Sequence, residues 1–193
     1  MYMKKEKKNK IAIIGHTKGI GKAIARLYKK KGFEIIGLSR SNGYDIETKQ
    51  QAIITKIFDC DLIVVNAYSG RGQYELLKQI YSAFHHHHKK VVIITSTSGT
   101  PEGKDEDNYG ADYNEYCWHK EHLIKYVSEL QEELFNKPLS VYDVCPDVVD
   151  TDMIKGMWEG LPKLKADEVA DAVRYCFESS FNINKIVIQK NVS

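Results

Sequence analysis

Three glycines near the start of the chain, and a tyrosine and lysine further along, have the residue types and spacing to do chemistry. Gly15, Gly19 and Gly21 directly follow an apolar run, which predicts a strand that turns into a helix. Such a turn brings backbone N–H groups and a helix N-terminus close to a pyrophosphate. Tyr116 and Lys120 are four residues apart, so they would share one face of a helix. A phenol beside an ammonium can exchange protons with a substrate, and the two features together predict nicotinamide-dependent redox chemistry.

The glycine spacing separates this turn from other phosphate-binding loops. It reads G-x-x-x-G-x-G rather than the G-x-G-x-x-G of many dehydrogenases. Lys22 follows Gly21 as in a kinase-type P-loop, but His16 occupies the position of the first P-loop glycine and Ala23 replaces the magnesium-binding Ser or Thr. A tight turn without a ligand is the alternative. The strand and amphipathic helix around the turn favour nucleotide binding.

The residues after the second predicted strand indicate which dinucleotide is bound. An acidic residue there would accept hydrogen bonds from the ribose 2′-OH of NAD. This chain has Ser39 and Arg40 instead, which offer room and positive charge for a 2′-phosphate. Lys18, within the glycine-rich turn, adds a second cation. The sequence therefore predicts NADP(H) as the cofactor.

Composition and charge exclude several other classes of protein. The chain has 193 residues, 42% of them hydrophobic, which favours one globular domain over residues 10–193. A net charge of +2 argues against a nucleic-acid partner, and most of the local basic excess lies in a solvated tail at residues 1–9. No apolar run approaches the length of a membrane span. Four widely spaced cysteines form no C-x-x-C pair and fit a reducing cytoplasm.

The elements that must position these residues alternate along the chain. Short β-branched runs predict strands at 11–14, 62–65, 91–94 and 141–144, with weaker ones at 34–38 and 185–189. Helical periodicity falls between them, at 20–31, 48–58, 74–84, 113–135 and 166–177. This alternation predicts an α/β fold: a three-layer, Rossmann-like, doubly wound and mainly parallel sheet. An acidic, glycine-rich loop at 99–112 follows a strand end, at the edge where such sheets bind ligands.

Five motifs occur in the order found in the short-chain dehydrogenase/reductase family, and the chain resembles a short, divergent member. Residues 15–21 resemble the family's glycine-rich motif, and 65–67 resemble part of the Asn-Asn-Ala-Gly stretch that closes its fourth strand. Residues 94–99 resemble the segment of the catalytic serine. Tyr116 and Lys120 match Tyr-x-x-x-Lys, and residues 146–153 are similar to the Pro-Gly-x-x-x-Thr segment after the sixth strand. Asp45, after an expected short third strand, matches an acidic residue that contacts adenine in many members.

The resemblance implies roles for individual residues. Tyr116 would be the acid/base, Lys120 would lower its pKa and hold the nicotinamide ribose, and Ser96 would orient the substrate oxygen. Ser98 competes with Ser96 for this role, but Ser96 has the family's spacing to Gly99. The catalytic set is therefore Ser96, Tyr116 and Lys120, and the expected cofactor contacts are Gly15, Thr17, Lys18, Gly19, Ile20, Gly21, Ser39, Arg40, Asp45, Asn66, Ala67, Tyr116, Lys120, Pro146, Val149 and Thr151.

Several positions depart from the family pattern. No asparagine occurs between Gly70 and Ser96, so the fourth catalytic residue of many members, an asparagine, is missing or replaced. Asp147 stands where a glycine usually contacts the nicotinamide, and Tyr68 replaces the glycine after Asn-Ala. The stretch between Arg40 and Asp45 is also too short for the usual helix.

Three hypotheses for function follow. The first is an NADPH-dependent oxidoreductase that transfers hydride between NADP(H) and a carbonyl or alcohol, with Thr151 on the carboxamide. The second is an NADP-binding regulatory or sensor protein that has lost turnover, and the third is a nucleotide-sugar epimerase or dehydratase. Assembly as a homodimer or homotetramer is expected from the resemblance alone.

Two further segments have alternative interpretations. Residues 153–161 contain Met157 and Trp158, and they could form either a lid over the substrate or a surface helix. Residues 85–88 are four consecutive histidines, which on a helix point around the cylinder rather than toward one metal ion. We therefore expect solvent-exposed histidines at a helix end, His119 flanking the site, and no metal.

Overall fold

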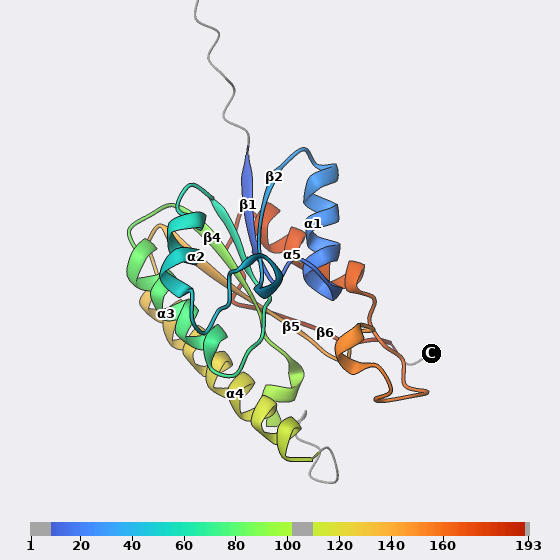
Figure 1. The fold of residues 1–193 in the computed structure, drawn as a ribbon. Helices are drawn as coiled ribbons and strands as arrows, with labels where there is room; N and C mark the ends of the chain where they lie inside the picture. Colours follow the sequence, from blue (N-terminus) through green and yellow to red (C-terminus); the bar gives the residue numbers. More distant parts are fainter. Residues whose placement is uncertain (1–8, 102–109, 192–193) are drawn as a thin grey trace, which may run out of the picture.

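The computed structural model describes residues 9–101 and 110–191, and its centre is a six-stranded parallel sheet (Figure 1). The strand order is β2-β1-β3-β4-β5-β6, so the chain starts one strand in from an edge of the sheet and winds outward from there in both directions. All six strands predicted from apolar runs form. Their bounds are β1 Lys10–Ile14, β2 Glu34–Leu38, β3 Leu62–Val65, β4 Lys89–Ile94, β5 Leu139–Pro146 and β6 Lys185–Ile188.

Five α-helices within the described residues cover the two faces of this sheet, which gives the three layers that the sequence predicts. Helices α1 and α5 pack on one face, and α2, α3 and α4 on the other (Figure 1). Their bounds are α1 Gly19–Lys30, α2 Gln50–Ile57, α3 Gly72–Phe84, α4 Gly110–Glu133 and α5 Ala166–Glu178. The glycine-rich turn therefore opens α1, and Tyr116 and Lys120 both lie on α4, as expected.

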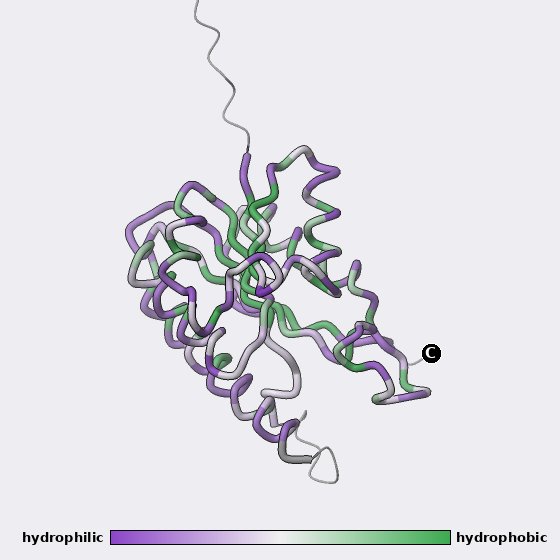
Figure 2. The backbone as a smooth tube through the Cα atoms, viewed as in Figure 1, coloured by the Kyte–Doolittle hydropathy of each residue, from purple (hydrophilic) through white to green (hydrophobic). Residues whose placement is uncertain are grey.

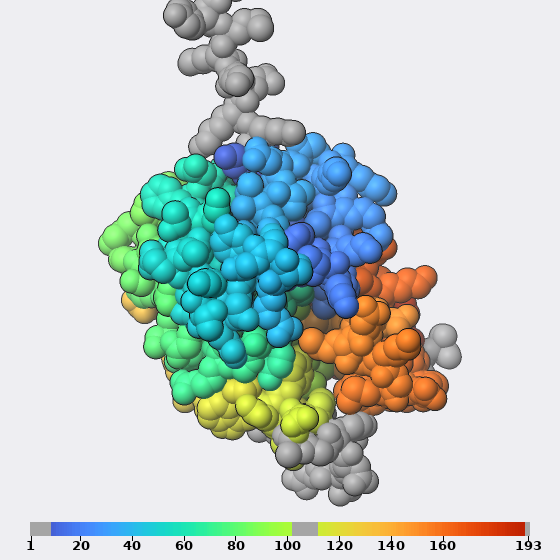
Figure 3. Space-filling model, viewed as in Figure 1, coloured from blue at the N-terminus to red at the C-terminus, as the bar shows by residue number. Residues whose placement is uncertain are grey.

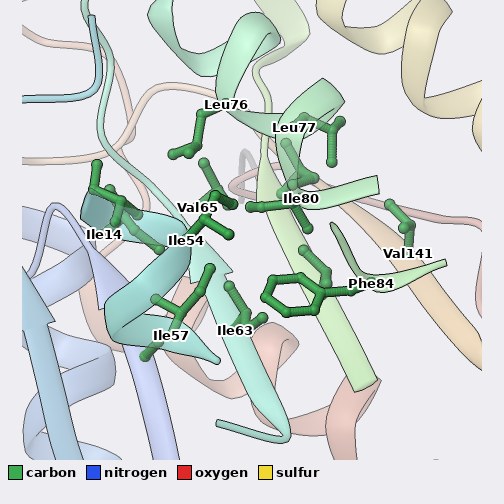
Figure 4. Close-up of a cluster of buried hydrophobic side chains, with 14 of the residues drawn as sticks. Ile14, Ile54, Ile57, Ile63, Val65, Leu76, Leu77, Ile80, Phe84 and Val141 are labelled. Atoms are coloured by element: carbon green, nitrogen blue, oxygen red, sulfur yellow. The ribbon is translucent and has the colours of Figure 1, made fainter. Parts of the chain in front are cut away.

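Each face of the sheet has its own apolar core. Side chains that alternate along β1, such as Ile13 and Ile14, point to opposite cores because successive residues of a strand face opposite sides. Figure 4 shows the larger core, in which Phe84 and Leu77 of α3 pack against Val141 and the strands. Figure 2 shows hydrophobic residues concentrated in the central strands. Strands covered on both faces need continuous apolar runs, which explains the unbroken runs in the sequence.

The expected short strand before Asp45 does not form. Residues Arg40–Asn42 make a 3-10 turn instead, and Asn42 stabilises it by accepting from the Ser39 backbone N–H at 2.8 Å. Gly43 then adopts a φ of 88°, which an L side chain would resist. These contacts fold the chain back toward α2 at once, so β2 is an edge strand. The segments resembling the family's fourth and sixth strands are the third and fifth strands here.

The segment after β5 contains no long surface helix. It has one 3-10 turn, at Asp152–Ile154, followed by further turns. A parallel bridge between Val149 and Leu164 joins the two ends of the segment, with the Asp150 N–H donating to the Leu164 carbonyl at 2.8 Å. Residues 150–163 therefore form a closed loop, and the helix alternative is wrong.

Other expectations concern the termini, the cysteines and the histidine run. Residues 1–8 of the basic tail and 102–109 of the acidic loop lie outside the described residues. All four cysteines are buried and free. Residues 85–88 lie beyond the end of α3, and the described side chains contain no group of three potential metal ligands. None of the described helices is both long and apolar enough to cross a membrane.

Candidate functional site

The glycine-rich turn is packed too tightly for larger residues at two positions. Gly15 has a φ of 91°, and a Cβ there would lie 2.7 Å from the backbone nitrogen of Ala67. A Cβ on Gly21 would lie 2.0 Å from the Gly15 carbonyl oxygen, a distance that no side chain can adopt. Asn66 closes the turn by donating from Nδ2 to the same oxygen at 3.0 Å. The glycines and Asn66 therefore hold the start of α1 against the ends of β1 and β3.

The N-terminus of α1 has the properties of an anion site. Lys18 is the N-cap residue but makes no side-chain capping bond, and the first turn contains no acidic residue. The helical bonds begin with Lys22 N–H to the Lys18 carbonyl at 3.2 Å, so earlier N–H groups point out of the helix end. Thr17 and Lys18 are exposed there. A pyrophosphate would find both oriented donors and the positive end of the helix dipole.

The segment after β5 approaches this turn from the other side. Pro146 ends β5 in a buried position, and Val149 is buried beside it. Thr151 then reaches the turn, since a Cβ on Gly19 would lie 3.0 Å from its Cγ2. Gly19 and Thr151 are therefore neighbours at one edge of the sheet although they are far apart in the sequence. The sequence predicts that they contact different parts of the same cofactor, the pyrophosphate and the nicotinamide.

The residues after β2 are only partly available to a ligand. The hydroxyl of Ser39 is buried and bonds to the Ser41 hydroxyl at 2.9 Å. Arg40 is exposed at the start of the 3-10 turn, so its positive charge is accessible to the 2′-phosphate for which the sequence predicts it. Asp45 accepts a hydrogen bond from the Glu47 N–H at 2.8 Å and thereby turns the chain toward α2.

The predicted catalytic serine and tyrosine lie together. Ser96 follows β4 and begins a 3-10 turn at Thr97–Gly99, and its side chain hydrogen-bonds to that of Tyr116. Gly99 allows this turn to press against α4, because a Cβ there would lie 2.6 Å from the Lys120 carbonyl carbon. Ser98, the alternative serine, bonds to Ser96 at 3.2 Å and accepts from Tyr113 at 3.1 Å. Ser96 is thus the serine that contacts Tyr116.

Lys120 is held by a residue that the sequence analysis missed. Its ammonium donates to Oε1 of Gln73 at 2.8 Å and to the Ile94 carbonyl at 3.1 Å, and it is 3% exposed. Gln73 in turn donates to the carbonyls of Val65 and Ile94 at 3.0 and 2.9 Å. A signal was present: Gln73 occupies an apolar-face position of α3, with Leu76, Leu77, Ile80 and Phe84 at helical spacing.

The pKa values of the tyrosine and lysine differ from the expectation. Burial raises the pKa of Tyr116 to about 12, although the hydrogen bond with Ser96 opposes this. The expected lowering by Lys120 is wrong for this structure, because the ammonium lies 5.6 Å from the Tyr116 ring centroid and is bonded to Gln73. Burial also lowers the pKa of Lys120 to about 8, although the negative charge of Asp143 acts to raise it.

A buried carboxylate lies behind the site. Asp143 of β5 is 2% exposed and accepts from the Thr95 hydroxyl, and the Lys185 ammonium lies 3.8 Å from its carboxylate. Burial raises its pKa to about 6, while the Thr95 bond and the charges of Lys185 and Lys120 lower it. Asp143 thus gives the buried Lys120 an opposite charge.

Two positions that flank the site also have defined partners. His119 is buried and its Nδ1 lies 3.1 Å from the hydroxyl of Tyr68, so it flanks the site as expected. Asp147 accepts from the Thr97 hydroxyl at 3.0 Å. Its carboxylate is therefore anchored to the turn that carries Ser96.

The residues present fit a nicotinamide dinucleotide. The uncapped end of α1 suits a pyrophosphate, and the exposed Arg40 suits an added phosphate. Nδ1 of His16 at the same edge is buried, with no hydrogen-bond partner among the described residues. It gives this edge one more polar atom that a ligand could satisfy.

Comparisons with known proteins support this fold. No protein-family model and no curated protein matches the sequence. Among solved structures, a small-chain dehydrogenase in complex with NADPH is 18% identical with a TM-score of 0.73, covering 94% of this chain and 95% of that one. The 3-alpha-hydroxysteroid dehydrogenase from Pseudomonas sp. B-0831, complexed with NADH, is 20% identical with a TM-score of 0.72, covering 93% and 94%.

An archaeal alcohol dehydrogenase extends the likeness over nearly the whole chain. The enzyme from Thermococcus sibiricus, complexed with 5-hydroxy-NADP, is 18% identical with a TM-score of 0.69, covering 97% of this chain and 100% of that one. At these identities the likeness shows the fold. The chain has the α/β, Rossmann-like fold of the short-chain dehydrogenases/reductases, as the sequence predicted.

Proposed function

We propose that the protein is an NADPH-dependent oxidoreductase of the short-chain dehydrogenase/reductase type, acting on a small carbonyl or alcohol. The observation that carries this proposal is the convergence of Ser96, Tyr116 and Lys120 at the same edge of the parallel sheet as the uncapped N-terminus of α1. Structures of the same fold, described as dehydrogenases in complex with NADPH or NADH, support a nicotinamide cofactor.

The mechanism follows from what these side chains can do. When bound, a nicotinamide would supply the hydride that reduces the carbonyl carbon. Negative charge then develops on the carbonyl oxygen, and Tyr116 gives that oxygen its phenolic proton, so the carbonyl becomes an alcohol. Ser96 donates a hydrogen bond to the same oxygen and orients it. Lys120 would stabilise the resulting phenolate if cofactor binding turned its ammonium from Gln73 and Ile94 toward Tyr116, and a proton from solvent would then restore the phenol.

Arg40 and Lys18 support NADPH rather than NADH. Arg40 is exposed at the end of β2, and Lys18 makes an exposed ion pair with Asp152 at 3.8 Å that a phosphate could replace easily. The first experiment is parallel titration with NADPH and NADH, followed by cofactor fluorescence. Arg40→Ala should weaken NADPH binding roughly tenfold and leave NADH unchanged, because a charge-assisted bond is lost. Arg71→Ala, also exposed, is the control, and binding of neither cofactor would refute the proposal.

A second experiment tests the role of Tyr116. Tyr116→Phe should abolish NADPH consumption while NADPH still binds, because the variant lacks only the phenolic proton. Tyr126→Phe, on the same helix and away from the site, should keep full activity. Full activity in Tyr116→Phe would refute the acid/base role.

The second candidate, a sensor protein without turnover, also has a specific observation in its favour. The pKa of Tyr116 is raised by burial, and the Lys120 ammonium is engaged by Gln73 and Ile94. Both features disfavour proton transfer unless the bound cofactor rearranges Lys120. Tight NADPH binding without consumption against a broad panel of carbonyl compounds would favour the sensor, and one good substrate would exclude it.

Assembly as a homodimer or homotetramer remains a prediction. Helix α4 leaves the side chain of Trp118 45% exposed, which a second copy could cover. Light scattering of the purified protein tests it, and a monomer at micromolar concentration would contradict it.

A further inference from the structure

Four aromatic rings form a continuous series that includes Tyr116, the proposed proton donor. Tyr68, after β3, meets Tyr116 edge to face with ring centroids 4.8 Å apart. Tyr113, one turn before Tyr116 on α4, stacks on it at 6.2 Å and an interplanar angle of 24°. Trp158 of the 150–163 loop meets Tyr113 at 5.8 Å. Three segments far apart in the sequence thus place rings in contact beside one hydroxyl.

The polar ends of these tyrosines are already bonded within the protein. The hydroxyl of Tyr68 bonds to His119 at 3.1 Å, and that of Tyr113 donates to Ser98 at 3.1 Å. The hydroxyl of Ser98 also bonds to Ser96. A substrate beside Tyr116 therefore meets mainly ring faces and edges, which favour apolar, flat groups over hydroxyl-rich ones.

Trp158 is held toward Tyr113 by an unusual backbone conformation. Its φ is 49°, in the left-handed region that a bulky residue rarely adopts. Gly156 and Gly160, on either side, have φ values of 83° and 80°, and the Lys163 ammonium donates to the Met157 carbonyl at 3.0 Å. In Figure 3 the orange loop lies beside the yellow start of α4. Strain of this kind concentrates at functional sites, and here it directs an indole into the ring series.

We infer that the substrate carries an aryl group or another flat conjugated ring directly on its reacting carbon, and that Tyr113 and Trp158 bind this ring. The inference rests on the proposed function, because it takes Tyr116 as the residue that contacts the reacting oxygen. When the reacting oxygen is hydrogen-bonded to Tyr116 and Ser96, the substituent on the reacting carbon lies against the rings of Tyr113 and Trp158. An aromatic partner gains offset-stacked or edge-to-face contacts that a saturated ring of similar size cannot make.

Two ketones of nearly equal size test this inference, acetophenone and cyclohexyl methyl ketone. Their dissociation constants are measured by calorimetry with and without NADP⁺, so that no turnover intervenes and the different reactivities of the ketones do not matter. We expect acetophenone to bind about tenfold more tightly, the effect of one good aromatic contact. Equal binding, or tighter binding of the cyclohexyl ketone, would overturn the inference.

Variants of the loop locate the contact. Trp158→Leu should remove most of the preference for the aryl ketone, and Trp158→Phe should keep it. Leu161→Ala, which trims an exposed side chain of the same loop, is the control and should change neither constant. Circular dichroism and NADPH affinity check that each variant is folded. A preference that survives in Trp158→Leu would refute the role of Trp158.

The outcomes separate this inference from the proposed function. Tight, selective binding of acetophenone without NADPH consumption would support the aryl site and argue against an oxidoreductase. NADPH consumption with aliphatic or hydroxylated carbonyl compounds, without preference for aryl ketones, would support the oxidoreductase and refute the aryl site.

Discussion

Replacing Gln73 with leucine should destabilise the protein strongly, although leucine matches glutamine in helix propensity. Gln73 is 2% exposed and makes three hydrogen bonds, two to the carbonyls of Val65 and Ile94 and one from the Lys120 ammonium. Neutral bonds contribute about 1 kcal/mol each and a bond to a charged group about 2 kcal/mol. Gln73→Leu should therefore lower the free energy of unfolding by about 4 kcal/mol.

The assay is urea unfolding near pH 7, with Gln79→Leu as the matched control. Gln79 lies on the same helix, is half-buried and has one side-chain partner, Gln50, so its replacement should cost about 1 kcal/mol. A double-mutant cycle with Lys120→Met isolates the charged bond, and we expect a coupling of about 2 kcal/mol. If Gln73→Leu costs no more than Gln79→Leu, the reasoning that Gln73 holds Lys120 is refuted.

Three further predictions follow from the site. Gly21→Ala should lower the free energy of unfolding by about 3 kcal/mol and abolish NADPH binding, since the alanine Cβ would lie 2.0 Å from the Gly15 carbonyl oxygen. The control is Gly32→Ala, whose Cβ would meet no atom within 4 Å, and it should cost about 1 kcal/mol and leave NADPH binding intact. Equal losses of stability and binding in the two variants would contradict this prediction. The folded-state pKa of Lys120 is lowered from 10.5 to about 8, so the unfolded state binds more protons between pH 8 and 10.5. As pH rises through this range, the stability of the wild type should increase by about 3 kcal/mol relative to Lys120→Met. Urea midpoints of the two proteins that stay parallel from pH 7.5 to 10.5 would refute this prediction. The pKa of Asp143 is raised from 3.8 to about 6, so the stability that its protonated form contributes is fully present below pH 3.8 and is lost as pH rises through 6. Between pH 4 and 7 the wild type should lose about 3 kcal/mol of stability relative to Asp143→Asn. Identical pH profiles of stability for the two proteins would disprove this.

The sequence by itself determined the elements and their order. Runs of β-branched residues, such as those around Ile13 and Val64, can only be buried as central strands of a covered sheet. Gly15 and Gly21 mark the turn into α1 because no residue with a Cβ fits there. The four-residue spacing of Tyr116 and Lys120 places them on one helix face in any fold that keeps the helix. These features are local, so composition and spacing were enough to predict them.

The tertiary structure decided which neighbours these residues meet, and therefore their chemistry. Gln73 reaches Lys120 only because α3 packs against α4 across 47 residues of sequence. Contacts with Tyr68 and Ser96, from two other segments, surround Tyr116, and burial raises its pKa, reversing the local expectation of a lowered value. The short turn at Arg40–Asn42, stabilised by Asn42, removed an expected strand and made β2 an edge of the sheet. Burial and contacts between distant segments depend on how the elements pack, and spacing along the chain carries no record of that packing.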